Sequence, residues 1–148
     1  MKTQTHFVNG TAWSGSSKRK VDIHNPATGE VSGEVLLANK ADVDEVVEIA
    51  QAAFETWSVT PVAKRAQVMF RFRDLLNQNI DELAELLSSE HGKTIPDAKG
   101  EIARGIEVIE FVCGMPHLLK GEFSEQVARG VDTHSTRQAL GVVAGITP

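Results

Sequence analysis

Side chains that could catalyse a reaction or bind a metal form no self-contained constellation in this sequence of 148 residues. The histidines fall in different predicted elements: His6, His24, His91, His117 and His134. Zinc ligands commonly occur at close helical or loop spacing, which these residues lack. Gly141 and Gly145 lie in an apolar run near the end, but no G-x-G-x-x-G motif follows it. The sequence therefore predicts neither a metal site nor a complete phosphate-binding loop.

The single cysteine, Cys113, is the only thiol that could act as a nucleophile. It continues an apolar stripe of Ile102, Ile106 and Ile109, whose spacing of three and four residues is that of one helical face. A thiol buried on such a face packs like a small hydrophobic side chain and is chemically inert. We therefore expect Cys113 to belong to the core and not to catalyse.

Arg104 lies in the stretch Gly-Glu-Ile-Ala-Arg-Gly (residues 100–105), near the start of a strongly apolar helical segment. Glu101 comes three residues before it and Glu107 three residues after it, so each is within reach on a helix surface. Such a pair stabilises a helix by only about 0.2 to 0.5 kcal/mol. Spacing alone therefore favours an ordinary surface salt bridge for Arg104.

Short strands are predicted first, because two extended segments flank Asn9-Gly10, a dipeptide typical of type I′ hairpin turns. A second strand pair is predicted around Val21 to Ile23 and Val31 to Leu37. The turn residues at 25–29, Asn-Pro-Ala-Thr-Gly, separate the two strands of this pair.

Four amphipathic helices are predicted to follow, from the apolar period of residues 41–57 and of three later segments. Thr60 is the expected N-cap of the second helix, and Asn79 with Glu82 is the expected capping pair of the third. The third helix should end at Gly92. The fourth should begin at Thr94, with Asp97 in its first turn, and should end near residue 121.

The last segment changes period again. Residues 123–136 show no helical spacing, and residues 140–146 form a short apolar run suited to a buried strand. A strand that is apolar on both faces needs cover on both, and no crossover helix follows it here. The sequence is therefore expected to be the first part of a longer protein.

The bulk composition excludes several classes of function. With 15 Lys and Arg against 20 Asp and Glu, the net charge is -5, which opposes binding to nucleic acid. The first residues lack the apolar segment of a secretory signal, and no run approaches the roughly 20 apolar residues that span a bilayer. We expect a cytoplasmic protein with no membrane or nucleic-acid partner.

Four stretches, in this order, resemble the aldehyde dehydrogenase superfamily. They are Asn-Pro-Ala-Thr-Gly-Glu (25–30), Ala-Ala-Phe-Glu-Thr-Trp (52–57), Glu-His-Gly-Lys-Thr (90–94) and Leu-Gly-Val-Val-Ala-Gly-Ile-Thr-Pro (140–148). The resemblance implies an α/β fold with β-hairpins, four helices, a β arm and the first strand of a Rossmann-like NAD-binding sheet. Residues 1–120 would belong to the NAD-binding domain, residues 121–139 to an oligomerisation arm, and residues 140–148 to that first strand.

Residues 100–107, with Glu110-Phe111 and Gly114-Met115-Pro116, resemble the CoA-acylating methylmalonate-semialdehyde dehydrogenases. This resemblance implies that Arg104 binds the substrate carboxylate, which reverses the salt-bridge interpretation. It also implies that Ile146, Thr147 and Pro148 approach the nicotinamide of NAD. The expected reaction converts methylmalonate or malonate semialdehyde to propionyl-CoA or acetyl-CoA, with NAD as oxidant and coenzyme A as acyl acceptor.

The same resemblance places the catalytic cysteine and most of the NAD pocket after Pro148, so the 148 residues are expected to be inactive alone. No residue of the chain is expected to be catalytic, and the full-length parent is expected to be a homodimer or homotetramer. Two alternatives remain open at this point. One is another aldehyde dehydrogenase, such as a succinate-semialdehyde dehydrogenase, and the other is a non-catalytic association module.

Overall fold

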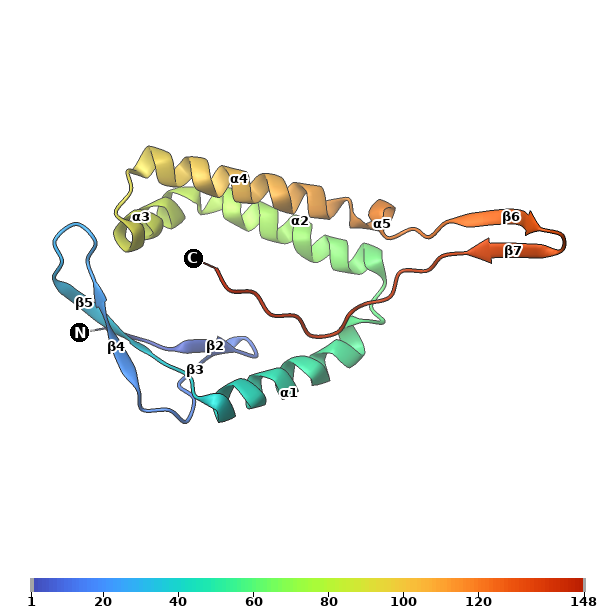
Figure 1. Ribbon diagram of the computed structural model, residues 1–148. Coiled ribbons are helices and arrows are strands. Elements are labelled where there is room, and N and C mark those ends of the chain that lie inside the picture. Colours follow the sequence, from blue (N-terminus) through green and yellow to red (C-terminus); the bar gives the residue numbers. More distant parts are fainter. Residues whose placement is uncertain (1, 148) are drawn as a thin grey trace.

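A small mixed sheet and a separate hairpin form the first part of the structure, a computed structural model that describes residues 2–147 (Figure 1). The strands are β1 (Lys2–Gln4), β2 (His6–Val8), β3 (Thr11–Trp13), β4 (Lys20–His24) and β5 (Val31–Leu36). The expected pairing of β4 with β5 is confirmed. β5 is also paired, in parallel, with β1, which the sequence does not indicate. The backbones of β1 and β5 approach closely at Gly33, where an added Cβ would lie only 2.9 Å from the Lys2 carbonyl oxygen.

The hairpin of β2 and β3 turns at Asn9-Gly10, as the sequence predicts. The φ angles are 50° at Asn9 and 78° at Gly10, and both are positive, as a type I′ turn requires. The ring of His6 on β2 lies 5.8 Å from that of Trp13 on β3, between ring centroids. The hairpin thus presents an aromatic pair.

Four long helices follow, as predicted: α1 (Lys40–Trp57), α2 (Val62–Gln78), α3 (Ile80–His91) and α4 (Ile95–Cys113). α4 packs against both α2 and α3, and α1 forms the opposite side of the molecule (Figure 1). Ala66 on α2, Ala84 on α3 and Ala98 on α4 are all buried. Their small side chains let the three helices approach closely, and the buried apolar side chains of the described residues all lie in this layer.

The expected end of the fourth helix near residue 121 is wrong. α4 ends at Cys113, Gly114 forms its C-cap, and a separate short helix α5 (Met115–Leu118) follows. Pro116 explains the break, because proline has no backbone N–H to continue the hydrogen bonds of α4. Gly114 closes α4 by donating its backbone N–H to the Phe111 carbonyl at 3.0 Å.

Two expected helix caps are also wrong. The Thr60 hydroxyl donates to the Thr56 carbonyl at the end of α1, and α2 begins after Pro61 without a side-chain cap. The Asn79 side chain donates to the Leu75 carbonyl at 2.7 Å, so it serves the end of α2 and leaves the start of α3 uncapped. In both cases the polar side chain donates a hydrogen bond to a carbonyl group of the preceding helix and so does not cap the next one.

The turn between α3 and α4 agrees with the sequence. Gly92 has a φ of 77° and ends α3, and the Thr94 hydroxyl accepts the Asp97 backbone N–H at the start of α4. A Cβ added at Gly92 would lie 3.2 Å from Cγ of Pro26. The turn after β4 therefore packs directly against this helix junction.

A two-stranded arm projects from the helical layer (Figure 1). It consists of β6 (Phe123–Ala128) and β7 (Val131–His134), which are antiparallel and exposed along their whole length. At its base Ser135 donates its backbone N–H to the Glu122 carbonyl at 2.8 Å. A hairpin arm is thus formed within the expected residues 121–139.

The strand expected over residues 140–146 is not formed. In the described residues 140–147 the segment belongs to no sheet and runs between α1 and α2 (Figure 1). Leu140 and Ile146 are almost fully exposed, at 95% and 101%. The physical reason is that a strand needs a neighbouring strand to receive its backbone hydrogen bonds, and none of the described strands pairs with this segment.

Asp42 joins the strand region to α1, although the sequence places it among the polar residues of that helix. It is 1% exposed, and its carboxylate accepts the backbone N–H groups of Ser16 at 2.6 Å and Asn39 at 2.9 Å. It also accepts the Ser16 hydroxyl at 2.8 Å and the Ser17 backbone N–H at 3.3 Å. Hydrogen bonds from the backbone of Asn39 and then of Ser16 lower the pKa of Asp42 to about 2.

Candidate functional site

Arg104 lies on α4 with its side chain exposed and without a partner among residues 2–147. Neither Glu101 nor Glu107 forms the ion pair with it that helical spacing alone favours. Glu101 instead pairs with Lys93, which precedes α4. The guanidinium of Arg104 therefore keeps all its N–H donors available.

The face of α4 that carries Arg104 points away from the helical layer. Residues four and seven positions further along, Val108 and Phe111, share this face and are 63% and 68% exposed. The opposite face carries Ala98, Ile106 and Cys113, which are buried against the neighbouring helices. The outer face thus combines one unpaired cation with two exposed apolar side chains.

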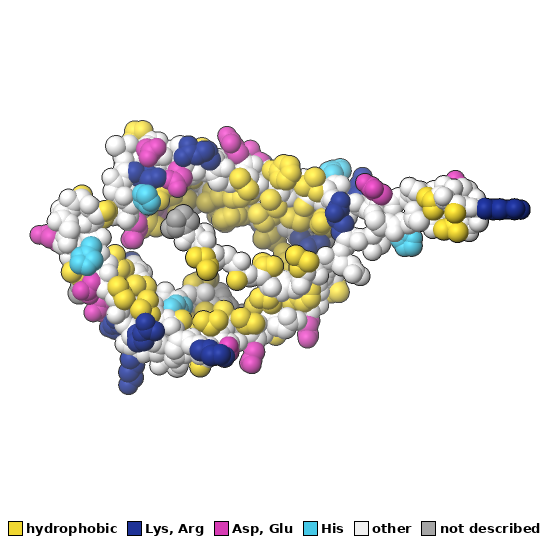
Figure 2. All heavy atoms as spheres, viewed as in Figure 1, with side chains coloured by type: hydrophobic (Ala, Val, Ile, Leu, Met, Phe, Trp, Pro, Cys, Tyr) yellow, Lys and Arg dark blue, Asp and Glu magenta, His cyan; other side chains and the backbone are white. Residues whose placement is uncertain are grey.

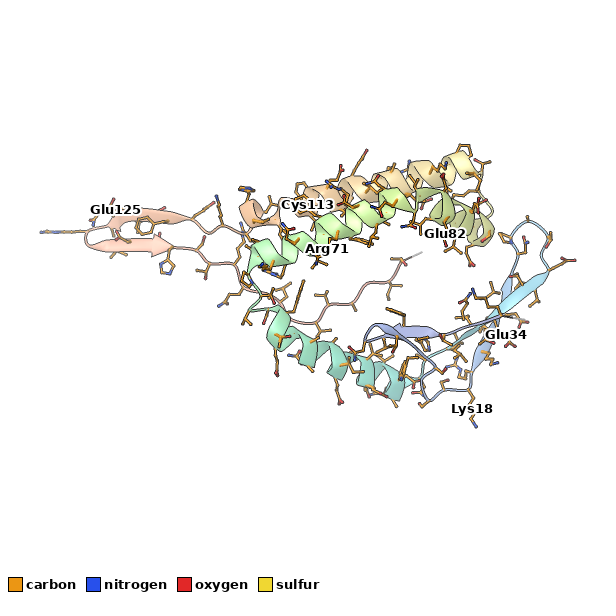
Figure 3. All side chains as sticks on the ribbon, turned by 180° about the vertical axis from the view of Figure 1, so that it is seen from behind. Lys18, Glu34, Arg71, Glu82, Cys113 and Glu125 are labelled. Carbon is orange, nitrogen blue, oxygen red and sulfur yellow. The ribbon has the colours of Figure 1, made fainter. Side chains whose placement is uncertain are left out.

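Cys113 is confirmed as a packed side chain. It is 8% exposed, and Figure 3 shows it at the end of α4 beside α2, whereas Glu125 lies far out on the arm. A thiol in this position is shielded from a substrate.

Other clusters of chemical interest do not form within the described residues. No three His, Cys, Asp or Glu side chains of residues 2–147 gather closely enough to hold a metal ion. In the same part of the chain, no helix combines the length and the apolar character needed to cross a bilayer.

Ile146 and Thr147, the expected nicotinamide contacts, are both exposed, and Pro148 lies outside the described residues. No hydrogen bond or ion pair within residues 2–147 joins either of them to Arg104. The structure therefore shows no polar contact between Arg104 and the two described residues expected to approach the nicotinamide.

The residues just before them line a groove of about 510 Å³. Val142 to Ala144 form one side, and the other sides come from the β2–β3 hairpin and from α1, including Val43 and Val47. A second apolar groove, of about 430 Å³, lies between α2, α3 and α4. Figure 2 shows hydrophobic side chains on both sides of the central hollow. The layer of α2 to α4 and the opposite helix α1 thus both turn apolar side chains toward the space through which residues 140–147 run.

Two residues with structural importance near these sites are not identified from the sequence. Lys93 belongs to a motif that the sequence shows, but its partner Glu101 is eight residues away. Asp42 is bound by a loop 25 and 26 residues earlier in the chain. Ser16 and Ser17 follow Gly15, whose positive φ of 66° favours glycine, so the glycine itself is a sequence signal for this loop.

The sequence pattern of the aldehyde dehydrogenase family matches residues 13–148. The chain belongs to the aldehyde dehydrogenase family. Two bacterial relatives are similar over nearly all of it. Malonate-semialdehyde dehydrogenase of Pseudomonas aeruginosa is 47% identical over 148 residues, and malonate-semialdehyde dehydrogenase 1 of Geobacillus kaustophilus is 48% identical over 143 residues. The chain spans about 30% of the length of these aldehyde dehydrogenases.

Solved structures of the family agree with the fold. A protein of Sinorhizobium meliloti 1021 described as a methylmalonate-semialdehyde dehydrogenase, complexed with NAD, has a TM-score of 0.95 and 53% identity, over 100% of this chain and 30% of that one. A methylmalonate-semialdehyde dehydrogenase of Oceanimonas doudoroffii has a TM-score of 0.88 and 46% identity, over 93% and 28%. The expected aldehyde dehydrogenase fold of mixed α/β class is therefore confirmed.

Proposed function

We propose that the full-length protein is an NAD-dependent, CoA-acylating dehydrogenase of methylmalonate or malonate semialdehyde, and that these residues form its amino-terminal part. The products are propionyl-CoA or acetyl-CoA. The names of the similar proteins support the substrate class, and the NAD complex of one of them supports the cofactor. The observation in this chain that carries the proposal is the unpaired guanidinium of Arg104 on the outer face of α4.

Arg104 binds the carboxylate of the semialdehyde in this proposal. A guanidinium presents two parallel N–H donors that match the two oxygens of a carboxylate. Val108 and Phe111 continue the same face and offer apolar contacts for the carbon atoms next to the carboxylate. Arg104 is thereby a binding residue that distinguishes an acidic aldehyde from a neutral one.

Ile146, Thr147 and Pro148 approach the nicotinamide side of NAD in this proposal. The exposed apolar side chain of Ile146 and the exposed Thr147 fit the edge of a flat apolar ring. NAD, when bound, accepts the hydride from the substrate, and coenzyme A accepts the acyl group. No glycine-rich phosphate loop is present in the sequence of this chain, so the pyrophosphate contacts belong to the rest of the full-length protein.

The catalytic cysteine also belongs to the rest of the full-length protein, because Cys113 is the only cysteine of these residues and is buried. We expect the purified 148-residue chain to reduce no NAD when it is given malonate semialdehyde and coenzyme A. Turnover above the protein-free rate would contradict this assignment of the nucleophile.

The remaining parts take structural roles. Residues 1–120 form part of the NAD-binding domain, residues 121–139 an arm for subunit assembly, and residues 140–148 a strand once a neighbouring strand is present. The exposure of β6 and β7 along their whole length supports the assembly role. The protein is cytoplasmic and a homodimer or homotetramer in this proposal.

The role of Arg104 is tested by Arg104→Leu in the full-length enzyme. Loss of a hydrogen bond to a charged group costs about 1.5 to 3 kcal/mol, which corresponds to a loss of roughly 10- to 150-fold in kcat/KM for malonate semialdehyde. The loss of kcat/KM should be much smaller for propanal, because propanal has no carboxylate. Steady-state NAD reduction at saturating coenzyme A measures both substrates.

Arg71→Leu is a matched control, because Arg71 is exposed on α2 and makes no ion pair within residues 2–147. It removes the same side chain from another helix, and kinetics with both aldehydes should stay unchanged. Equal use of malonate semialdehyde by Arg104→Leu and by the parent would contradict the proposed function.

A further inference from the structure

The side chain of Lys93 forms an ion pair with Glu101, the carboxylate that helical spacing also places within reach of Arg104. Its Nζ is paired with Glu101 and lies 3.8 Å from a carboxylate oxygen of Asp97. Glu101 is three residues before Arg104, a spacing at which opposite charges on a helix attract each other. Lys93 and Arg104 therefore compete for the Glu101 carboxylate, and in the structure Lys93 is paired with it.

Lys93 is held in place by its surroundings, which gives it the advantage. Its side chain is only 17% exposed. Its backbone carbonyl accepts the Ser88 hydroxyl at 2.6 Å, and the neighbouring Gly92 lies against Pro26. The hydrogen bond from Ser88 and the packing of Gly92 against Pro26 hold the turn before α4 in place. Lys93 therefore loses little additional conformational entropy when it pairs with Glu101.

The charges along α4 agree with this arrangement. The hydrogen bond and the charge of Lys93 are the main causes that lower the pKa of Glu101 below its ordinary value, and Arg104 contributes least among the causes. Arg104 is thus near enough to be attracted to Glu101, yet no ion pair within residues 2–147 joins them.

We propose that Lys93 is a positioning residue that holds Glu101 away from Arg104 and so keeps the guanidinium ready for the carboxylate of an acidic aldehyde. This inference rests on the proposed role of Arg104. A guanidinium already paired with Glu101 would have to exchange one carboxylate for another when substrate binds. With Glu101 held by Lys93, the substrate meets no internal competitor.

The test is Lys93→Met in the full-length enzyme, which keeps an apolar stem of similar length and removes the charge. Glu101 is then free to pair with Arg104, and exposed ion pairs of this kind shift an equilibrium by about 2- to 5-fold. We expect KM for malonate semialdehyde to rise by about 2- to 5-fold. KM for propanal should not change, because propanal does not use Arg104.

Glu101→Gln separates positioning from a general structural effect. In the Lys93→Met background it should restore KM for malonate semialdehyde, because the competing carboxylate is gone. Alone it should leave this KM nearly unchanged, because Lys93 already holds Glu101. Lys93→Arg, which retains the cation, should behave as the parent.

Lys99→Met is the matched control. Lys99 lies on α4, close to Lys93 in the sequence, but its partner is Asp81 on α3. Its loss removes one ion pair from the same helix without releasing Glu101, so both KM values should stay at the parent level. Melting temperatures of all variants show whether folding has changed.

Three results would overturn the inference. They are an unchanged KM for malonate semialdehyde in Lys93→Met, a rise that Glu101→Gln does not reverse, and a fall in KM with Glu101→Gln alone. The KM of the Glu101→Gln variant alone still tests the inference if Lys93→Met does not fold. If Arg104→Leu has no effect, the proposed function and this inference both fail, whereas a large effect there with no effect of Lys93→Met removes only this inference.

Discussion

The Ser16 backbone N–H points at the Asp42 carboxylate from 2.6 Å, and the Ser16 hydroxyl reaches the same oxygen from 2.8 Å. Both groups come from the loop before β4, and Asp42 lies in the first turn of α1. No Lys or Arg forms an ion pair with this carboxylate within residues 2–147, so neutral donors alone satisfy it. The contact fixes the loop to the start of α1.

This arrangement predicts a pH dependence of stability. The pKa of Asp42 falls from 3.8 to about 2 on folding, so the folded state favours the ionised carboxylate. Its contribution should be fully present above pH 3.8 and should be lost as the pH falls toward about 2. Urea unfolding of the parent and of Asp42→Asn measures it. We expect a higher midpoint for the parent at neutral pH and a shrinking difference below pH 3.8. A difference that stays constant down to the lowest pH would assign the effect to shape and not to charge.

Gly15→Ala should destabilise the protein more than Gly10→Ala. Both glycines have positive φ angles, 66° and 78°, so alanine is strained at either position by about 1 to 2 kcal/mol. Only at Gly15 would the added Cβ also meet a side chain, because Asp42 Cγ would lie 3.0 Å away. We therefore expect a total loss of about 1 to 3 kcal/mol in the free energy of unfolding, larger than that of Gly10→Ala. Equal losses in chemical denaturation would show that the Asp42 contact adds nothing.

Ala98→Leu should disturb the packing of α3 and α4. Ala98 is fully buried, and extra methylene groups in a packed core cost about 1 to 3 kcal/mol. Ala103→Leu makes the same change on the exposed part of α4 and should alter the free energy of unfolding by less than about 0.5 kcal/mol. Thermal or urea unfolding compares the two, and similar values would mean that the helices can separate to accept the larger side chain.

Cys113 should react slowly with an aromatic disulfide reagent while the protein is folded. It is 8% exposed, so modification requires local opening of the helix contacts. We expect labelling to be on the order of 100-fold slower than in urea. Stoichiometric labelling at the same rate in both conditions would place the thiol on an accessible surface.

Several local signals in the sequence predict local structure correctly, although the expected caps at Thr60 and Asn79 do not form. Asn9-Gly10 predicts the first hairpin, and Thr94 with Asp97 predicts the start of α4, because each signal acts within a few residues. The apolar stripe likewise predicts the burial of Cys113. In each case the signal lies within one hairpin, one helix start or one face of a single helix.

Contacts between segments that are distant in the sequence could not be predicted in the same way. The polar position of Asp42 on α1 gives no indication that a loop 25 and 26 residues earlier binds it. Spacing makes Glu101 a partner for Arg104, but it does not show that Lys93 pairs with Glu101 first. Apolar character predicts a strand at residues 140–146, yet a strand forms only where another strand lies beside it. These outcomes depend on which segments meet in space.

The parallel pairing of β1 with β5 has a practical consequence for handling the protein. Residues 2–4 shield one long side of β5, and their removal would convert β5 into an edge strand with unpaired N–H and C=O groups. Such edges act as templates for pairing between molecules. Shortening the chain from this end is therefore expected to reduce solubility before it affects any kinetic property. An affinity tag joined ahead of Lys2 would emerge directly from a sheet strand, so it would need a flexible spacer to leave that pairing undisturbed.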